Sequence, residues 1–181
     1  MKVVNVKLKS ASAYSQSKFY ETEKEDKELF RDYEARTWRE RLHVDEKGYV
    51  FIPPIQFKNC LSEAAKYLSI QIPGKGKATY TKHFEAGILI TEPVVLSIKK
   101  DDVPGEWYHV PSDGKRGGGK RVLKCFPVIN EWSGNLMVYI LDDTITEDVL
   151  IYHLKEAGKF IGIGRFRPRN NGFYGRFTVV E

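Results

Sequence analysis

The chain has 181 residues, of which 41% are hydrophobic and 13% aromatic; this proportion supplies a packed core and excludes a wholly disordered chain. No apolar run approaches the ~18–20 residues that span a bilayer, and the length fits a single domain. We therefore expect one cytoplasmic domain over residues 1–181, without a membrane partner. The formal net charge of +5 at pH 7 is modest, but the positive charges are segregated, and segregation attracts polyanions more strongly than the net value indicates.

Residues 3–9 alternate polar and apolar side chains, so that Val4, Val6 and Leu8 fall on one face. This pattern predicts a half-buried strand and not the continuous apolar stretch of a signal peptide. Residues 10–48 follow as a long polar insertion, within which 21–39 has the spacing of a helix. An insertion of this length in a compact domain is usually either functional or disordered.

Residues 49–52 are typical of a short strand, which Pro53 and Pro54 end. Proline suits the first turn of a helix, because its missing N–H has no helical partner there. The residues that follow place apolar side chains on one helical face, and the segment 72–77 ends this helix. The face consists of Phe57, Leu61, Ala64, Ala65 and Leu68.

The second half of the chain is rich in β-branched residues and predicts a run of strands. The predicted strands cover residues 87–99, 122–129, 136–141 and 173–180. The first of them is broken at Pro93, because proline cannot donate to a sheet ladder. Thr144 and Glu147 have the spacing of a capping box, which opens a helix that we expect Gly158 to end.

The predicted order of elements is strand, helix, strand, strand, helix, strand. This is the ferredoxin-like (RRM-like) βαββαβ pattern of the α+β class. Relative to that pattern, the chain carries a long insertion at about 10–48 and an inserted hairpin, or thumb, at about 100–134. Cys60 and Cys125 lie among apolar residues without a CxxC spacing, so we expect buried free thiols, no metal site and no cofactor.

The segment 158–176 combines glycines, arginines and aromatic residues and contains no acidic residue. Glycine lets a backbone approach a ligand closely, arginine pairs with phosphate through two hydrogen bonds, and aromatic rings offer faces on which bases stack. The side chains concerned are Arg165, Phe166, Arg167, Arg169, Tyr174 and Arg176. They favour a nucleic-acid contact, and the alternative is a solvated turn between a helix and an edge strand.

A second basic segment, residues 113–121, is rich in glycine. Such a loop either wraps a phosphate backbone and orders on binding or is a solvated hairpin tip. Its candidate contacts are Arg116, Lys120 and Arg121.

Two further segments have weaker signals. The segment 73–83 contains Lys75 and Lys77 but lacks the spacing of an ATPase phosphate-binding loop, so it is a basic contact loop or a plain loop. Trp38 stands among the arginines of 36–41, where it either stacks on a base or is buried at the end of an amphipathic helix.

The segment 162–176 follows a helix and leads into the last strand, and it resembles the glycine-rich loop of the RAMP superfamily, the ferredoxin-like backbone subunits and relatives of CRISPR effector complexes. The segment 51–58 is similar to the start of a helix in that superfamily, with Pro54 where glycine is usual. The whole chain also resembles a family of tailed-phage proteins. The resemblance implies a groove for single-stranded nucleic acid between Lys58, a thumb containing 114–121 and the glycine-rich loop. It further implies head-to-tail assembly into a homo-oligomer or filament.

Together, the residues and the resemblance predict a phage-encoded protein that binds single-stranded RNA or DNA in the host cytoplasm. Basic side chains would neutralise phosphates, and aromatic side chains would stack bases. The predicted binding residues are Trp38, Lys58, Lys75, Lys77, Arg116, Lys120, Arg121, Arg165, Phe166, Arg167, Arg169, Tyr174 and Arg176.

Two alternatives stay open. The same arginines suit an acidic protein surface, with the acidic residues of 20–34 facing a basic partner, as in a CRISPR-subunit mimic or a phage assembly or host-takeover protein. Some RAMP relatives cut RNA with an aspartate or histidine after the first strand, and Asp26, Asp32 and His43 lie in the corresponding region here. None of them stands in a matching motif, so we expect no catalytic residue and no enzyme activity.

Overall fold

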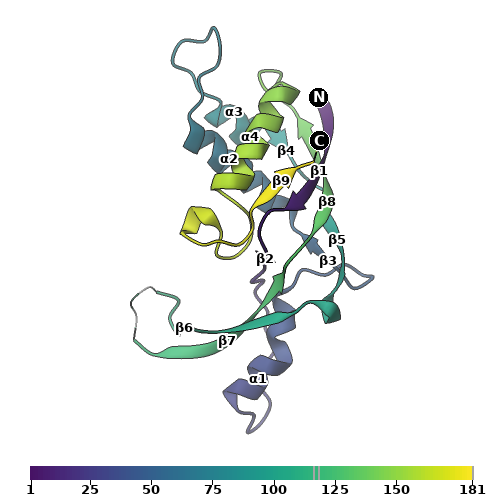
Figure 1. The fold of residues 1–181 in the computed structure, drawn as a ribbon, viewed down its shortest axis with the longest axis vertical. Coiled ribbons are helices and arrows are strands. Elements are labelled where there is room, and N and C mark those ends of the chain that lie inside the picture. Colours follow the sequence, from purple (N-terminus) through teal and green to yellow (C-terminus); the bar gives the residue numbers. More distant parts are fainter. Residues whose placement is uncertain (116, 118, 181) are drawn as a thin grey trace.

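The computed structural model describes residues 1–115, 117 and 119–180, and the predicted binding residue Arg116 lies outside these ranges. Helices are combined with antiparallel strands along the chain (Figure 1), which confirms the predicted α+β class. None of the helices in the described ranges has the length and apolarity needed to cross a bilayer.

A four-stranded antiparallel sheet with the order β4-β8-β1-β9 carries the core. Its strands are β1 (Lys2–Ser10), β4 (Ile88–Leu89), β8 (Ser133–Ile140) and β9 (Phe177–Val179). Successive residues of a strand point to opposite faces, so β1 buries Val4, Val6 and Leu8, as predicted. Helices α2 (Pro54–Leu68) and α4 (Glu147–Phe160) lie side by side against the buried face of the sheet (Figure 1).

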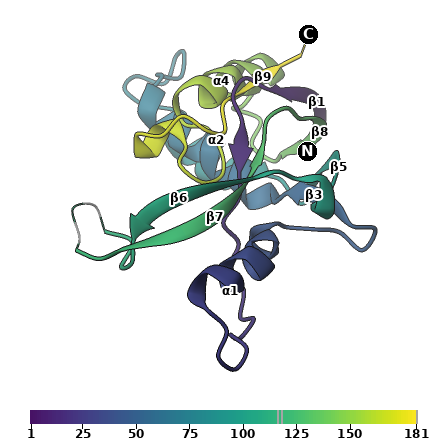
Figure 2. The same cartoon turned by 60° about the horizontal axis from the view of Figure 1, so that its bottom comes forward.

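A second sheet, of order β2-β7-β6, extends away from the helices as a long hairpin (Figure 2). Its strands are β2 (Tyr14–Ser15), β6 (Gly105–Pro111) and β7 (Arg121–Ile129). Strands β3 (Tyr49–Ile52) and β5 (Val94–Lys99) form a separate pair. Helix α1 (Phe30–Thr37) and the 3₁₀ turn η1 (Trp38–Arg41) pack against β7. The remaining elements are α3 (Thr81–Gly87) and the 3₁₀ turns η2 (Lys100–Asp102) and η3 (Pro168–Asn170).

An aromatic cluster joins the main sheet to α2. The rings of Phe57 and Phe177 are 5.7 Å apart and nearly perpendicular, and Trp132 lies 6.5 Å from each of them. All three side chains are buried, and edge-to-face pairs of this kind add stability beyond the area that they bury. The cluster fixes the first turns of α2 relative to β9, and the loop that precedes β9 is held beside them.

The structure confirms where several of the predicted strands and helices begin or end. The strand at 49–52 and the helix that begins at Pro54 are observed as β3 and α2. The predicted strand at 87–99 is divided on either side of Pro93 into β4 and β5. The helix predicted over 21–39 was wrong in extent, because α1 begins only at Phe30. Like charges four residues apart, such as Glu21 and Glu25, destabilise a helix in the preceding segment.

The ends of α4 and the start of β9 also differ from the prediction. The capping residue is Thr146 and not Thr144, since the Thr146 hydroxyl accepts a hydrogen bond from the Val149 N–H. Gly158 lies inside the helix and does not end it. A Cβ at Gly158 would lie 2.1 Å from the Phe177 carbonyl oxygen, so glycine lets α4 approach β9 closely. The last strand begins only at Phe177, because residues 173–176 belong to the preceding loop.

Candidate nucleic-acid interface

The glycine-rich loop (residues 162–176) connects α4 to β9. It folds against residues 11–20, which follow β1 and include β2; we call these residues the segment after β1. The Arg165 N–H donates to the Ser15 carbonyl oxygen at 2.9 Å. Gly164 has a φ of +75°, and a Cβ there would lie 2.5 Å from the same oxygen. Glycine is therefore required at this position for both backbone conformation and space, and the close approach places Arg165 and Arg167 beside the segment after β1.

The guanidinium of Arg165 is held by aromatic rings. Its Nε donates to Ser15 Oγ at 3.2 Å, and its Cζ lies 3.8 Å from the centre of the Phe126 ring in β7. The rings of Tyr108 and Tyr174 lie 5.8 and 5.7 Å from the same carbon. Burial lowers the pKa of Arg165, yet arginine does not lose its proton in proteins. The loop therefore presents a positive charge in a position set by its neighbours.

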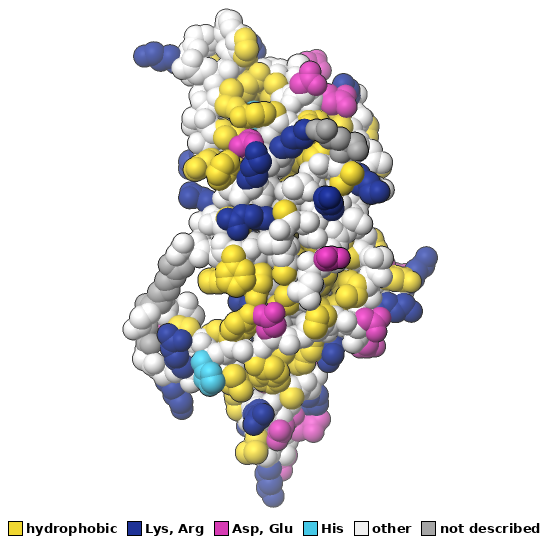
Figure 3. Space-filling model, viewed as in Figure 1, with side chains coloured by type: hydrophobic (Ala, Val, Ile, Leu, Met, Phe, Trp, Pro, Cys, Tyr) yellow, Lys and Arg dark blue, Asp and Glu magenta, His cyan; other side chains and the backbone are white. Residues whose placement is uncertain are grey.

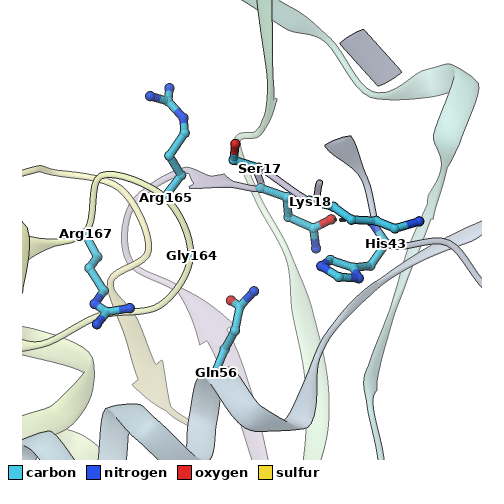
Figure 4. A pocket seen from close by; sticks show the side chains of 8 residues that line it. Ser17, Lys18, His43, Gln56, Gly164, Arg165 and Arg167 are labelled. Atoms are coloured by element: carbon cyan, nitrogen blue, oxygen red, sulfur yellow. Dashed lines mark hydrogen bonds between the residues drawn. The ribbon is translucent and has the colours of Figure 1, made fainter. Parts of the chain in front are cut away.

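A pocket of about 260 Å³ lies between the glycine-rich loop, the segment after β1 and the start of α2. Figure 4 shows Gln56 pointing into it from α2, Arg165 and Arg167 on the loop side, and Lys18 and His43 on the other side. Burial, and secondarily the charge of Lys18, lower the pKa of His43, so this imidazole is neutral at pH 7. The lining residues of this basic pocket are Gln16, Ser17, Lys18, His43, Gln56, Gly164, Arg165 and Arg167.

A second pocket, of about 350 Å³, continues from the basic pocket and shares Ser17 and Lys18 with it. We name it the outer pocket. It lies where the segment after β1 passes α1 and β7. Its lining residues are Ser17, Lys18, Phe19, Tyr20, Tyr33, Arg41 and Lys124. The two pockets thus form one path along the surface.

A buried carboxylate fixes the cations of the outer pocket. The Glu34 side chain has 0% exposure; its Oε1 lies 2.8 Å from Arg41 Nη1, and its Oε2 lies 3.5 Å from Lys124 Nζ. The Cys125 N–H donates to Glu34 Oε1 at 2.9 Å. A buried charge needs such partners, because desolvation without them costs several kcal/mol. This member of the acidic segment therefore holds α1 to β7.

Positive side chains border the path formed by the two pockets, which we name the basic track. Its cations are Lys18, Arg41, Lys124, Arg165 and Arg167. Among the described residues that line either pocket, none is Asp or Glu. On the face in Figure 3, Lys and Arg side chains gather over the end of α4 and the glycine-rich loop, with hydrophobic side chains beside them toward the β6–β7 hairpin. A hollow lined by one sign of charge concentrates the opposite charge.

The predicted arginines of the glycine-rich loop divide between two sides. Arg167 lines the basic pocket and donates from Nη2 to Glu63 Oε1 at 3.0 Å. Arg169 Nε lies 4.0 Å from the other oxygen of Glu63. Arg176 Nε donates to the Lys159 carbonyl oxygen at 3.1 Å. Arg169 and Arg176 therefore lie toward α2 and α4 and do not line the basic track.

The predicted aromatic stacking residues differ in accessibility. Trp38 is 7% exposed, and the Arg39 guanidinium lies 4.1 Å from its ring, so Trp38 presents no open face. Tyr174 is 4% exposed and is likewise packed inside the protein. Phe166 is 41% exposed, so its ring is accessible to a ligand. Phe173, which the sequence did not single out, is more exposed, at 56%.

The predicted lysines outside the loop lie away from the track. Lys58 Nζ donates to the carbonyl oxygens of Phe84 and Glu85 at 2.6 and 2.9 Å, and burial lowers its pKa. It therefore satisfies the last turn of α3. Lys75 contacts Thr144, just before α4, and Lys77 belongs to the same loop. This loop lies at the opposite end of the long axis from α1 (Figure 1).

The hairpin cations also lie outside the two pockets. Lys120 and Arg121 are exposed at the start of β7, and Arg121 Nη1 donates to the His109 carbonyl oxygen at 3.3 Å. The structure therefore brings Arg165 and Arg167 together with cations that the sequence did not single out as binding residues. These additional cations are Lys18, Arg41 and Lys124.

The cations of the basic track that the sequence analysis did not single out have no distinctive pattern of residues around them. Lys18 stands alone in a polar segment, and Lys124 sits between apolar residues of β7. Arg41 belongs to a segment that was singled out for its tryptophan. These cations come together only in the folded protein, because β2 pairs with β7 and so brings the segment after β1 to the hairpin.

Metal chemistry has no evident site in the part of the chain that the structure describes, where no group of three or more His, Cys, Asp or Glu side chains is placed to hold an ion. Cys60 and Cys125 are both free and buried, as predicted. Burial raises the pKa of the Cys60 thiol to about 12 and that of Cys125 to about 11, so neither is a reactive thiolate at neutral pH.

Solved structures with a similar fold exist, although their sequences differ strongly from this one. No protein-family model and no curated protein matches the chain in sequence. The crystal structure of Cmr6 from Pyrococcus furiosus superposes with a TM-score of 0.55 at 11% identity, covering 99% of this chain and 98% of Cmr6. A chain of the type III-B Cmr-beta complex bound to cognate target RNA gives 0.53 at 11% identity, covering 99% of this chain and 58% of that one. These likenesses show that the chain shares its fold with Cmr6 and with this chain of the Cmr-beta complex.

Proposed function

We propose that this protein binds single-stranded nucleic acid along the basic track. The observation that carries the proposal is the junction of two pockets at Ser17 and Lys18, with cations along both and no acidic lining residue described in either. Phosphate contacts from Arg and Lys dominate the affinity of proteins for nucleic acids. A continuous path of hollows bordered by several cations suits a flexible phosphate backbone better than a single small anion.

Two features favour a single strand over a duplex. Exposed aromatic side chains are present at the track: Phe19 lines the outer pocket and is 79% exposed, and Phe166, which follows Arg165 in the chain, is 41% exposed. Bases can stack on such rings only when they are not paired within a duplex. The cations also lie in hollows and not on a convex ridge or helix that would enter a DNA groove.

The structural neighbours direct the choice of probe. One of them is described as bound to cognate target RNA, so RNA is the first strand to test, and single-stranded DNA is the second. We also propose that the main sheet and its two helices form a ferredoxin-like domain, since the order β4-β8-β1-β9 is the one in which two split βαβ units interleave. Phage origin and assembly into a homo-oligomer or filament stay predictions from the resemblance.

We further propose that the track binds without cutting. General acid–base cleavage needs groups to remove and to deliver a proton. The described lining of the basic pocket offers the His43 imidazole without a carboxylate beside it. Incubation of the protein with end-labelled RNA tests this proposal. Intact RNA is the expected result, and cleavage that disappears in His43→Ala would overturn it.

Fluorescence anisotropy tests the binding function directly. Labelled 30-nucleotide single-stranded RNA, single-stranded DNA and duplex DNA are titrated with protein at low salt. We expect tighter binding to one or both single strands than to duplex. Replacement of Arg165 and Arg167 by alanine should lower the affinity at least about tenfold, because hydrogen bonds to charged groups are among the stronger ones. Absence of binding to every probe would overturn the function.

A further inference from the structure

A third hollow, of about 190 Å³, lies between strand β6 and the glycine-rich loop. We name it the aromatic pocket. Its volume is below the ~300–1,000 Å³ of pockets that hold drug-sized ligands, so it suits a single ring system. Its lining residues are Tyr108, His109, Val110, Arg165, Phe166, Phe173 and Tyr174. The pocket is therefore built by two segments far apart in the sequence.

Most of the residues that line the aromatic pocket have aromatic rings. The Phe173 ring lies 4.5 Å from that of Tyr174 and 5.7 Å from that of Phe166. The polar ends of the tyrosines are used within the protein, since the Tyr174 hydroxyl donates to Glu106 Oε2 at 2.9 Å and lies 2.7 Å from the Tyr108 hydroxyl. With these groups satisfied, the pocket offers a ligand aromatic surface and little demand for hydrogen bonds.

The backbone of Phe166 is held in an unusual conformation. Its φ is +56°, in the left-handed region that bulky residues seldom adopt. The Tyr174 N–H donates to its carbonyl oxygen at 3.2 Å, and a Cβ on Gly172 would lie 1.7 Å from that oxygen. Residues 172–174 of the loop therefore pack against the backbone of Phe166, while the residue stays 41% exposed. Strained residues of this kind cluster at ligand sites.

Arg165 belongs to both the aromatic pocket and the basic pocket. A phosphate bound by Arg165 in the track would therefore have a nucleobase within reach of the aromatic pocket. We propose that this pocket takes one unstacked nucleobase of the bound strand, a role that rests on the proposed binding function and deepens it. Stacking accepts every base, so the pocket selects an unpaired nucleotide and not a sequence.

The test separates base contacts from phosphate contacts. Wild type, Phe166→Ala and Phe173→Ala are titrated with a natural single strand and with a strand of the same length made of abasic nucleotides. Phe160→Ala is the matched control, because Phe160 is also exposed, at 46%, but pairs with Tyr67 on the helices. Thermal unfolding of each variant verifies that it is folded, and Phe173→Ala avoids the strained position.

We expect the two pocket variants to lose roughly 5- to 100-fold in affinity for the natural strand, the range seen for one stacked base. Their affinity for the abasic strand and the slope of log K against log salt should match those of wild type, because the phosphate contacts are unchanged. Phe160→Ala should bind both strands as wild type does. Equal binding of the natural strand by wild type and both pocket variants would overturn the base pocket while leaving the binding function intact. Absence of salt-dependent binding by wild type would overturn both.

Discussion

The guanidinium carbon of Arg165 lies 3.8 Å from the centre of the Phe126 ring, which joins the glycine-rich loop to strand β7. The guanidinium of Arg41 lies 5.1 Å from the same ring. Phe126 thus contacts two cations of the basic track, of which Arg41 also pairs with the buried Glu34 carboxylate. A ring contact of this kind contributes roughly 0.5–2 kcal/mol, and at Arg165 it leaves the positive charge available to a ligand.

Phe126→Leu tests this positioning. The substitution keeps an apolar side chain but removes the ring face, so the arginines should become less ordered. We expect the affinity for a single strand to fall several-fold while the salt slope stays the same, since no charge is removed. Anisotropy titrations at several salt concentrations measure both quantities, with Phe160→Leu as the control. Wild-type affinity in Phe126→Leu would show that the ring does not position the arginines.

Gly164→Ala tests the close approach between the loop and the segment after β1. Alanine at a φ of +75° is strained, and its Cβ would lie 2.5 Å from the Ser15 carbonyl oxygen. We expect a loss of at least about 1–3 kcal/mol in the free energy of unfolding, measured by urea denaturation. Gly119→Ala is the matched control, because a Cβ there has nothing within 4 Å. A Gly164→Ala variant as stable as wild type would contradict the geometry.

Local patterns were sufficient for part of the fold. The alternation of Val4, Val6 and Leu8 predicted β1, and the two prolines predicted where β3 ends and α2 begins. Helix α3 was not predicted, and the bounds of β6 were not given within the hairpin expected at about 100–134, because α3 has only seven residues and β6 is largely half-exposed. Short or half-exposed segments depend on tertiary contacts more than on their own periodicity.

The site was less predictable than the fold. Arg165 and Arg167 could be singled out because they lie in a loop with glycines and without acids. Lys58 has the same charge, but its ammonium group is used by the carbonyl groups at the end of α3. Composition does not reveal whether a cation has an internal partner. Lys18 and Lys124 join the track only because β2 and β7 pair, which is a contact between distant segments.

Glu34→Gln tests the buried ion pair behind the outer pocket. The carboxylate is fully buried between Arg41 and Lys124, and removal of its charge leaves Arg41 buried without a counter-ion. We expect a loss of about 3–5 kcal/mol in the free energy of unfolding. Asp32→Asn, an exposed position in the same helix, should change the free energy by less than about 1 kcal/mol. Similar small losses in both variants would mean that the pair is dispensable.

His43 should make binding depend on pH. Burial and Lys18 hold its pKa below the ordinary value of 6.5, so it is neutral in the free protein at pH 7. A bound phosphate favours the protonated form and raises this pKa. Affinity should therefore increase as the pH falls from 7.5 to 5.5, by up to about tenfold if the pKa rises by one unit. The His43→Asn variant should lack this component in anisotropy titrations at constant ionic strength. An identical pH profile in the variant would exclude His43 as its source.

The lowered pKa of His43 also affects the stability of the free protein, which should decrease as the pH falls, whereas the affinity for nucleic acid should increase. Below pH 6.5 the unfolded chain binds a proton at His43 that the folded chain binds less readily. The free energy of unfolding should therefore fall as the pH is lowered from 6.5 toward the folded-state pKa. Urea denaturation of wild type and His43→Asn over this interval measures the contribution of His43.

The most direct measurement compares two charge-matched double variants in a salt series with labelled single-stranded RNA. Lys18→Ala with Arg165→Ala removes two cations of the basic track, whereas Lys75→Ala with Lys77→Ala removes two cations from the loop near Thr144. For about four neutralised phosphates, the slope of log K against log salt should be roughly −3 in wild type. It should become shallower by roughly 1.4 in the track variant and stay unchanged in the loop variant. Equal slopes in the two variants, or a slope near zero in wild type, would contradict binding along the basic track.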